Sequence, residues 1–274
     1  MGRKGKGGAA WRAGPATPRG SGRGGDWIYG RRPVIEALRA GRRRFDELRV
    51  SATAHEDCSE EELSEIQALA SECGLRVAPT ERRELTLLLG PVNHQGVALK
   101  AGPYQYVDIE DILASDDGGG DSTILFLDHI EDPQNLGSLL RSAEAAGVAG
   151  VIIPEDRAAE VTPAAVRASA GAAEAIRVAK VVNLVRAIEK AKDAGFWITG
   201  LDFGDDARDY SEIDYRGRVG IVVGNEGRGV SRLVRAKCDY IATLPMLGSV
   251  DSLNAAVSGA IVIYEALRQR REKK

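Results

Sequence analysis

Amide, hydroxyl and guanidinium side chains lie directly after two predicted strands of this sequence. LDHIEDPQNLGSLLR contains Asn135 and Arg141, and LPMLGSVDSLN contains Ser252 and Asn254. A guanidinium group binds phosphate and stabilises negative charge that develops on oxygen, whereas amides and hydroxyls orient a ligand through hydrogen bonds. Side chains of these types at the ends of strands indicate a ligand site.

A glycine-rich loop, GNEGRGVS, follows a third predicted strand, RVGIVVG. Its glycines at 224, 227 and 229 permit close approach of the backbone to a ligand. Glu226 would repel a phosphate held in this loop, and neither the G-x-x-x-x-G-K-[ST] nor the G-x-G-x-x-G motif can be placed on it. The loop therefore indicates a ligand whose contacts here are not phosphates.

Strands and helices alternate from residue 123 to residue 274. The predicted strands are TILFLD, GVIIP, IRVAK, FWITGL, VGIVVG and YIATLP, and the predicted helices span 135–147, 162–170, 182–194, 230–237 and 252–271. This alternation predicts a parallel α/β domain over 123–274. Ligands gather at the carboxyl edge of such a sheet, so the three polar loops are expected to lie together.

Periodicity within two of these helices predicts their buried faces. Asn135 occupies the expected N-cap of the first helix. The buried stripe of that helix is predicted to comprise Leu136, Leu139, Leu140 and Ala143. The inner face of the last helix is predicted to comprise Leu253, Val257, Ala260, Ile261 and Tyr264.

Residues 26–102 predict a second, smaller α/β unit. Its expected elements are a helix in WIYGRRPVIEALRAG that Gly41 ends, strands in ELRVS, LRVAP and GVALKA, a helix in SEEELSEIQALASECG and a helix near 80–89. Ser59 and Glu62 have the spacing of a capping box, and Gly74 ends the same helix. Residues 103–122 are predicted to be a linker, with a short acidic helix and a glycine-rich hinge.

Positive charge is concentrated at the start of the chain, although the net charge is −3. The first 50 residues contain 13 Lys and Arg against 4 Asp and Glu, and the remainder contains 24 against 36. A basic region on an otherwise acidic protein favours contact with a polyanion. The arginines predicted to dock RNA are Arg31, Arg32, Arg42, Arg43 and Arg44.

The first 25 residues contain nine glycines and six basic residues but no acidic residue. Such a segment buries too little apolar surface to offset its ordering entropy, so we expect a disordered basic tail over 1–25. Three interpretations stay open: a nonspecific RNA-binding arm, a solvated tail, or an organelle transit sequence.

The remaining composition excludes several classes of protein. Cys58, Cys73 and Cys238 form no C-x-x-C pair, and we expect free thiols in a reducing compartment and no metal site. No apolar run reaches the ~20 residues needed to cross a bilayer. We therefore expect a soluble, cytoplasmic protein without a membrane partner.

Together the three loops resemble the SpoU branch of the SPOUT RNA ribose methyltransferases, also called the TrmH family. The matching motifs are N-x-G-x-x-x-R from Asn135 to Arg141, G-x-E-G-x-G from Gly224, and S-L-N from Ser252 to Asn254. The smaller unit, with NHQGVAL, is similar to the substrate-binding domain of the RlmB type. RlmB-type enzymes methylate a guanosine 2′-hydroxyl in the peptidyl-transferase P loop of large-subunit ribosomal RNA.

The resemblance implies a deep C-terminal trefoil knot, S-adenosyl-L-methionine as cofactor, and a homodimer with the active site close to the subunit interface. The implied catalytic residues are Asn135, Arg141, Glu226, Ser252 and Asn254. The implied cofactor contacts are Gly224, Leu244, Met246 and Leu253, and His94 and Gln95 join the five arginines as substrate contacts. Arg141 would orient the target phosphate, while a phosphate or water takes the proton.

The resemblance predicts a guanosine 2′-O-methyltransferase that acts on 23S ribosomal RNA. The same chemistry on transfer RNA is an alternative, since related enzymes differ mainly in their flanking elements. A non-catalytic RNA-binding factor of ribosome assembly is an alternative of another class. Loss of Asn135, Arg141 or Asn254 would be expected in such a factor, and all three are present.

Overall fold

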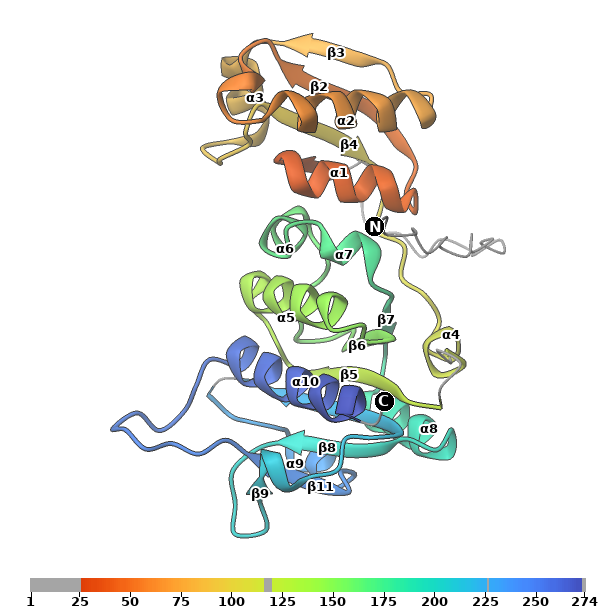
Figure 1. Cartoon of the computed structure of the whole chain (residues 1–274), viewed down its shortest axis with the longest axis vertical. Coiled ribbons are helices and arrows are strands. Elements are labelled where there is room, and N and C mark those ends of the chain that lie inside the picture. The colour runs from red at the N-terminus through yellow and green to blue at the C-terminus, as the bar shows by residue number, and fades with distance from the viewer. Residues whose placement is uncertain (1–25, 116–119, 226, 273–274) are drawn as a thin grey trace.

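The computed structural model describes residues 26–115, 120–225 and 227–272 (Figure 1). The predicted basic tail over 1–25 and the predicted site residue Glu226 lie outside the described residues. Two sheets are present, a four-stranded one near the start of the chain and a seven-stranded one after it. The two predicted α/β units therefore correspond to two separate sheets.

The N-terminal domain contains a sheet of order β1-β4-β2-β3. Its elements are β1 (Asp26–Tyr29), α1 (Arg31–Ala40), β2 (Phe45–Ser51), η1 (Ala54–Glu56), α2 (Glu60–Glu72), β3 (Val77–Thr80), α3 (Arg82–Leu89) and β4 (Val97–Ala101). The Ser59/Glu62 capping box is confirmed, since both reciprocal hydrogen bonds form. The first predicted helix is wrong over residues 27–29, which belong to β1, pair antiparallel with β4 and bury Ile28.

The C-terminal domain contains a sheet of order β7-β6-β5-β10-β8-β11-β9, and each of its neighbouring strand pairs is parallel. Its strands are β5 (Ser122–Asp128), β6 (Gly150–Pro154), β7 (Val178–Val181), β8 (Trp197–Leu201), β9 (Arg208–Asp209), β10 (Arg218–Gly224) and β11 (Tyr240–Thr243). The prediction of a parallel α/β domain is confirmed. The two-residue strand β9 is too short to give a sequence signal.

Helices cover both faces of the larger sheet. They are α4 (Ile109–Leu113), α5 (Pro133–Ala145), α6 (Pro163–Ala168), α7 (Ala172–Ala175), α8 (Leu184–Asp193), α9 (Arg232–Arg235) and α10 (Ala255–Glu272), with η2 at Tyr210–Glu212. Side chains of α5 and α10 join one apolar cluster with Leu125 and Val223, and those of α4, α8 and α9 join another with Phe126. Successive residues of β5 thus supply the cores of opposite faces, as expected for a strand.

The first helix after β5 begins two residues earlier than predicted. Asp132 is its N-cap and accepts a hydrogen bond from the backbone of Gln134, and Pro133 occupies the first turn. Proline is favoured there because a backbone N–H in the first turn has no helical partner, so its absence costs nothing. The capping role expected for Asn135 is therefore wrong.

The predicted inner face of α10 is also wrong in part. Val257 and Tyr264 are 47% and 49% exposed. The face turned to the core instead carries mostly small residues, namely Ala255, Ala256, Gly259, Val262, Ile263 and Ala266. The small side chains of this face let α10 pack closely on α5, and Val257 and Tyr264 lie on another side of the helix.

Part of the segment predicted as a linker packs against the C-terminal sheet. Val107 forms an isolated parallel bridge with Ala179 of β7. Ile112 of α4 is fully buried in the cluster beneath β5 and β6. Residues 116–119, where the glycine-rich hinge was predicted, lie outside the described residues.

The three cysteines are free thiols, as predicted. Burial raises the pKa of the Cys238 thiol to about 12, so this thiol stays protonated and is a poor nucleophile at neutral pH. Among the helices of the described chain, none is long and apolar enough to cross a membrane.

Gly137 of α5 lies where this helix crosses α6. A Cβ at this position would lie 2.7 Å from the Ala165 carbonyl oxygen and 2.9 Å from the Ser169 nitrogen. We expect Gly137→Ala to destabilise the fold by roughly 1–3 kcal/mol, because backbone must move, and this exceeds the helix-propensity gain of about 1 kcal/mol. Chemical denaturation measures this change in the free energy of unfolding. Ser138→Ala, at an exposed neighbour, is the control, and equal stability of the two variants would contradict the close crossing.

Candidate active site

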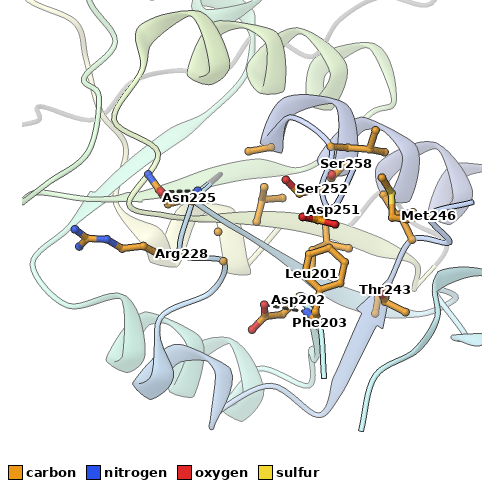
Figure 2. A pocket seen from close by; sticks show the side chains of 18 residues that line it. Leu201, Asp202, Phe203, Asn225, Arg228, Thr243, Met246, Asp251, Ser252 and Ser258 are labelled. Carbon is orange, nitrogen blue, oxygen red and sulfur yellow. Dashed lines mark hydrogen bonds between the residues drawn. The ribbon is translucent and has the colours of Figure 1, made fainter. Parts of the chain in front are cut away.

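A cavity of about 400 Å³ opens at the carboxyl ends of β8, β10 and β11 (Figure 2). This volume lies within the range of small-molecule sites. The lining residues are Leu201, Asp202, Phe203, Val223, Gly224, Asn225, Gly227, Arg228, Gly229, Ala242, Thr243, Leu244, Met246, Asp251, Ser252, Leu253, Ala255 and Ser258. The cavity thus joins four segments between residues 201 and 258.

The glycine loop folds back onto the end of β10. A Cβ on Gly224 would lie 2.5 Å from the backbone nitrogen of Val230, and one on Gly229 would lie 2.6 Å from the Asp202 carboxylate. Gly229 also has a left-handed φ of 64°. The Asn225 side chain accepts from the backbone of Gly227 at 3.0 Å, which closes the turn. Glycine is required here by space and by conformation.

A hydrogen bond joins the first and third predicted motifs across 119 positions of the sequence. Nδ2 of Asn254 donates to Oδ1 of Asn135 at 2.9 Å. The other atom of the same amide, Oδ1 of Asn254, accepts from the backbone of Ala256 at 2.9 Å and of Val257 at 3.3 Å. Asn254 therefore caps α10 and aligns the start of α5 at once.

The predicted cofactor contacts converge in space. Leu244, Met246 and Leu253 line the cavity with Gly224, and Ser252 also lines it. In Figure 2, Met246 and Ser252 lie around the cavity, whereas the side chain of Arg228 extends away from it.

Arg141 lies away from this cavity. It is exposed on α5, two helical turns beyond the start of that helix, and is not among the cavity-lining residues. Within the described part of the chain no carboxylate pairs with its guanidinium, which leaves that group available to another molecule.

The loop after β8 supplies lining residues that sequence reasoning missed. Asp202 and Phe203 follow the predicted strand FWITGL directly. The rule that ligands gather at the carboxyl edge of a parallel sheet would have selected this loop. Asn225 was also missed, and its Nδ2 donates to the carbonyl of His129 at 3.1 Å, which ties the loops after β5 and β10 together.

Four of the residues predicted to contact substrate lie in internal contacts. His94 is buried between Thr86 and the backbone of Gly96, and burial lowers the pKa of its ring, which favours neutral imidazole. Gln95, Arg42 and Arg43 contact the C-terminal domain. Because these four side chains hold protein structure, they present little to a bound RNA.

The other predicted arginines remain at the surface of the N-terminal domain. Arg44 is 87% exposed and Arg32 is 57% exposed. Arg31 is partly exposed and pairs with Glu62 of α2 at 2.9 Å. Arg32 and Arg44 are the most exposed members of the set, and each lies beside a carboxylate, Arg32 at 3.4 Å from Glu62 and Arg44 at 3.1 Å from Asp46.

A parallel sheet, a glycine loop without a phosphate-binding lysine and a cavity of this size define a cofactor-binding α/β enzyme. The SpoU rRNA Methylase family profile matches residues 122–264, and a profile for RNA 2′-O ribose methyltransferase substrate binding matches residues 27–107. The chain belongs to the SpoU rRNA methylase family.

Curated relatives agree with this assignment. An "Uncharacterized tRNA/rRNA methyltransferase" of Mycobacterium avium (strain 104) is 41% identical over 248 residues, which cover 89% of this chain and 77% of that protein. A protein of Staphylococcus saprophyticus, named for the TrmH family of tRNA/rRNA methyltransferases, is 40% identical over 244 residues, covering 89% and 95%.

Solved structures share the whole fold. An AdoMet-bound rRNA methyltransferase from Sinorhizobium meliloti has a TM-score of 0.71 at 25% identity, covering 89% of this chain and 87% of that one. The SpoU methyltransferase AviRb from Streptomyces viridochromogenes has a TM-score of 0.73 at 27% identity, covering 92% and 91%. The protein is thus an S-adenosyl-L-methionine-dependent RNA 2′-O-methyltransferase with a SPOUT fold.

The cavity fits this cofactor. Leu244, Met246 and Leu253 offer apolar surface to the adenosyl group, and the glycine loop offers backbone without an anion-binding side chain. The carboxylates of Asp202 and Asp251 add negative charge that favours a cationic donor. Among the described residues no group of His, Cys, Asp and Glu could hold a metal ion.

Asn254 allows its two roles to be tested separately. Asn254→Ala should lose the helix cap, about 1 kcal/mol of stability. Asn254→Asp keeps an oxygen for the cap but loses the N–H group that reaches Asn135. We therefore expect Asn254→Asp to keep the stability of the native protein and to lose roughly tenfold or more in methyl transfer, because the two loops are no longer aligned.

Denaturation curves and transfer of a labelled methyl group to RNA provide the two measurements. Native turnover by Asn254→Asp would show that the link to Asn135 is dispensable.

Proposed function

We propose that the protein methylates a guanosine 2′-hydroxyl in 23S ribosomal RNA, in the peptidyl-transferase P loop, as part of ribosomal RNA processing in the cytoplasm. One observation carries the choice of ribosomal RNA. The S. meliloti structure named as an rRNA methyltransferase matches 89% of this chain, including the N-terminal domain. The A. aeolicus TrmH/SpoU tRNA modifying enzyme matches only 60% of it, with a TM-score of 0.52 and 29% identity.

Positioning carries much of the catalysis in this proposal. S-adenosyl-L-methionine supplies, when bound, a methyl group on a positively charged sulfur. Asn135, held by Asn254 at 2.9 Å, fixes the target ribose beside the cavity. Arg141 binds the neighbouring phosphate and stabilises negative charge on the 2′-oxygen, while phosphate or water accepts the proton, because a guanidinium stays protonated at neutral pH. For Glu226, which lies outside the described residues, the role in this proposal is to order the glycine loop.

A homodimer completes the site in this proposal. Val257 and Tyr264 form an exposed apolar stripe on α10, and Leu247 and Val250 are exposed on the preceding loop. An apolar patch of this kind, next to a cavity, is typical of a protein interface. A second copy covering the stripe would bring its own Arg141 close to this cavity. The deep trefoil knot implied by the resemblance stays a prediction.

Mapping of 2′-O-methyl groups tests the target. Ribosomal and transfer RNA are compared between cells with the gene, cells without it, and cells in which it is restored. We expect one mark in the P loop to disappear and return. A mark that disappears from transfer RNA would replace the proposed target by the alternative one, and unchanged marks in both RNAs would favour the non-catalytic assembly factor.

Removal of Arg141 tests its role toward the substrate. We expect Arg141→Ala to lower turnover by roughly 100-fold or more, because an oxyanion-stabilising donor is lost, and to leave cofactor affinity nearly unchanged. Arg186→Ala on α8 is the control, because Arg186 is also an exposed helical arginine. Single-turnover kinetics and calorimetric titration with S-adenosyl-homocysteine are the measurements. A large loss of cofactor affinity would contradict this role.

A charge in the apolar stripe of α10 tests the dimer. We expect Val257→Arg to shift the protein to monomers in analytical ultracentrifugation, because a buried guanidinium without a partner opposes association. Methyl transfer should fall with it, since the partner's Arg141 is removed from the site. Val182→Arg, at another exposed valine, is the control. A native protein that sediments as a monomer would refute the dimer.

A further inference from the structure

The two domains meet at a buried ion pair. Arg43, in the loop after α1, donates from Nε to Oε2 of Glu174 at 3.1 Å and from Nη2 to Oε1 at 2.6 Å. Both side chains are 1% exposed. The carboxylate of Asp26 lies 3.7 Å from the same guanidinium. Separation of this pair is costly, because each charge is left buried and unpaired when the other moves away.

Tyr104 ties the connecting segment to the same pair. The guanidinium carbon of Arg43 lies 4.7 Å from the centre of the Tyr104 ring, a cation–π distance. The Tyr104 hydroxyl donates to the carbonyl of Ala173 in α7 at 2.8 Å. Arg42 donates to two carbonyl groups at the C-terminal end of α7 at 2.5 and 2.7 Å. Both domains and the segment between them therefore share one polar network.

A second set of contacts holds the beginning of α1. Oε1 of Gln95 accepts from the backbone of Arg31 at 3.2 Å and from Nη1 of Arg167 in α6 at 3.4 Å. Gly171, with a left-handed φ of 93°, lets α7 approach α1, since a Cβ there would lie 2.7 Å from the Glu36 side chain. In Figure 1, α1 lies directly above α6 and α7. The C-terminal domain thus contacts the chain near both ends of α1, and these contacts oppose rotation of the N-terminal domain.

We infer that Arg43 and Glu174 are positioning residues, which hold the substrate-binding domain at a fixed distance and orientation from the donor cavity. Domains joined by a linker move relative to one another by default, unless their interface prevents it. Here, movement would expose a buried ion pair and break the contacts of Arg42 and Gln95. The inference rests on the proposed role of the N-terminal domain in holding RNA.

A fixed distance between the two sites selects a class of substrate. RNA that is held by the N-terminal domain places a ribose in the cavity only if the folded RNA spans the distance between that domain and the cavity. A folded RNA element satisfies this condition, whereas a short single strand that carries the target nucleotide does not need the N-terminal domain. The junction therefore contributes to the methylation of folded RNA and not to methyl transfer itself.

Glu174→Gln tests the inference, because it keeps the shape of the side chain and removes its charge. A double variant, Arg42→Ala with Tyr104→Phe, weakens the same junction without leaving an unpaired buried charge. Glu65→Gln is the matched control, since it breaks the exposed pair of Arg39 with Glu65. Cofactor affinity and thermal unfolding establish that each variant is folded.

Two readouts are compared across these proteins. The first is the distance distribution between spin labels on Cys73 and on Asp193→Cys, with Cys58 and Cys238 replaced by alanine. The second is kcat/KM on a folded ribosomal RNA fragment and on a short oligonucleotide with the same target nucleotide. We expect one narrow distance in the native junction and a broad one in both junction variants. On folded RNA the variants should lose roughly tenfold or more, because small misplacements strongly slow reactions; on the oligonucleotide they should match the native protein.

A broad distribution in the native junction would overturn the inference, as would equal losses on the two RNAs. If the native protein methylated neither RNA, the proposed target would be wrong, and the distance distribution would still decide whether the junction is rigid.

Discussion

The insertion of β10 between β5 and β8 is the constraint on which the site depends. Residues 218–224 pair with 122–128 on one side and with the strand ending at Leu201 on the other. Neighbouring strands lie about 4.8 Å apart, so loops that are distant in the chain start side by side. The donor cavity is lined by residues at and after the ends of β8, β10 and β11, and no single one of these segments forms it alone.

Small residues make this arrangement sterically possible. Gly224 lets the loop after β10 return against Val230, and Gly259 lets α10 approach Leu139 of α5, where a Cβ would lie 2.5 Å from its side chain. The polar contact between Asn135 and Asn254 then aligns the start of α5 with the start of α10, and α10 lines the cavity through Ala255 and Ser258. Close packing brings the helices together, and the hydrogen bond between the two amide side chains sets how they are aligned.

Charge has two different uses in this protein. Buried at the domain junction, Arg43 meets Glu174 and fixes an orientation. On the surface, Arg141, Arg32 and Arg44 are exposed to solvent, where a phosphate can reach them. A count of arginines along the sequence does not separate these uses, because the difference lies in which acidic or carbonyl groups the fold brings within reach.

Much of the architecture followed from local patterns. The alternation of apolar strands and helices identified the parallel sheet, and the Ser59/Glu62 spacing identified a helix start, because both signals act between residues close in the chain. The three motifs likewise pointed to their loops. Local signals failed for β1, whose strand form depends on pairing with β4, and for Val257, whose exposure depends on the side of α10 that packs on α5.

By itself, therefore, the sequence determined the elements, the family resemblance and the types of side chain that do the chemistry. Only the tertiary structure decided that Asn254 reaches Asn135, that the loop after β8 lines the cavity, and that Arg43 is enclosed while Arg44 faces solvent. The physical reason is that helix and strand formation are governed by near neighbours, whereas burial, ion pairing and cavity formation are set by the three-dimensional packing of segments that are not neighbours in the chain.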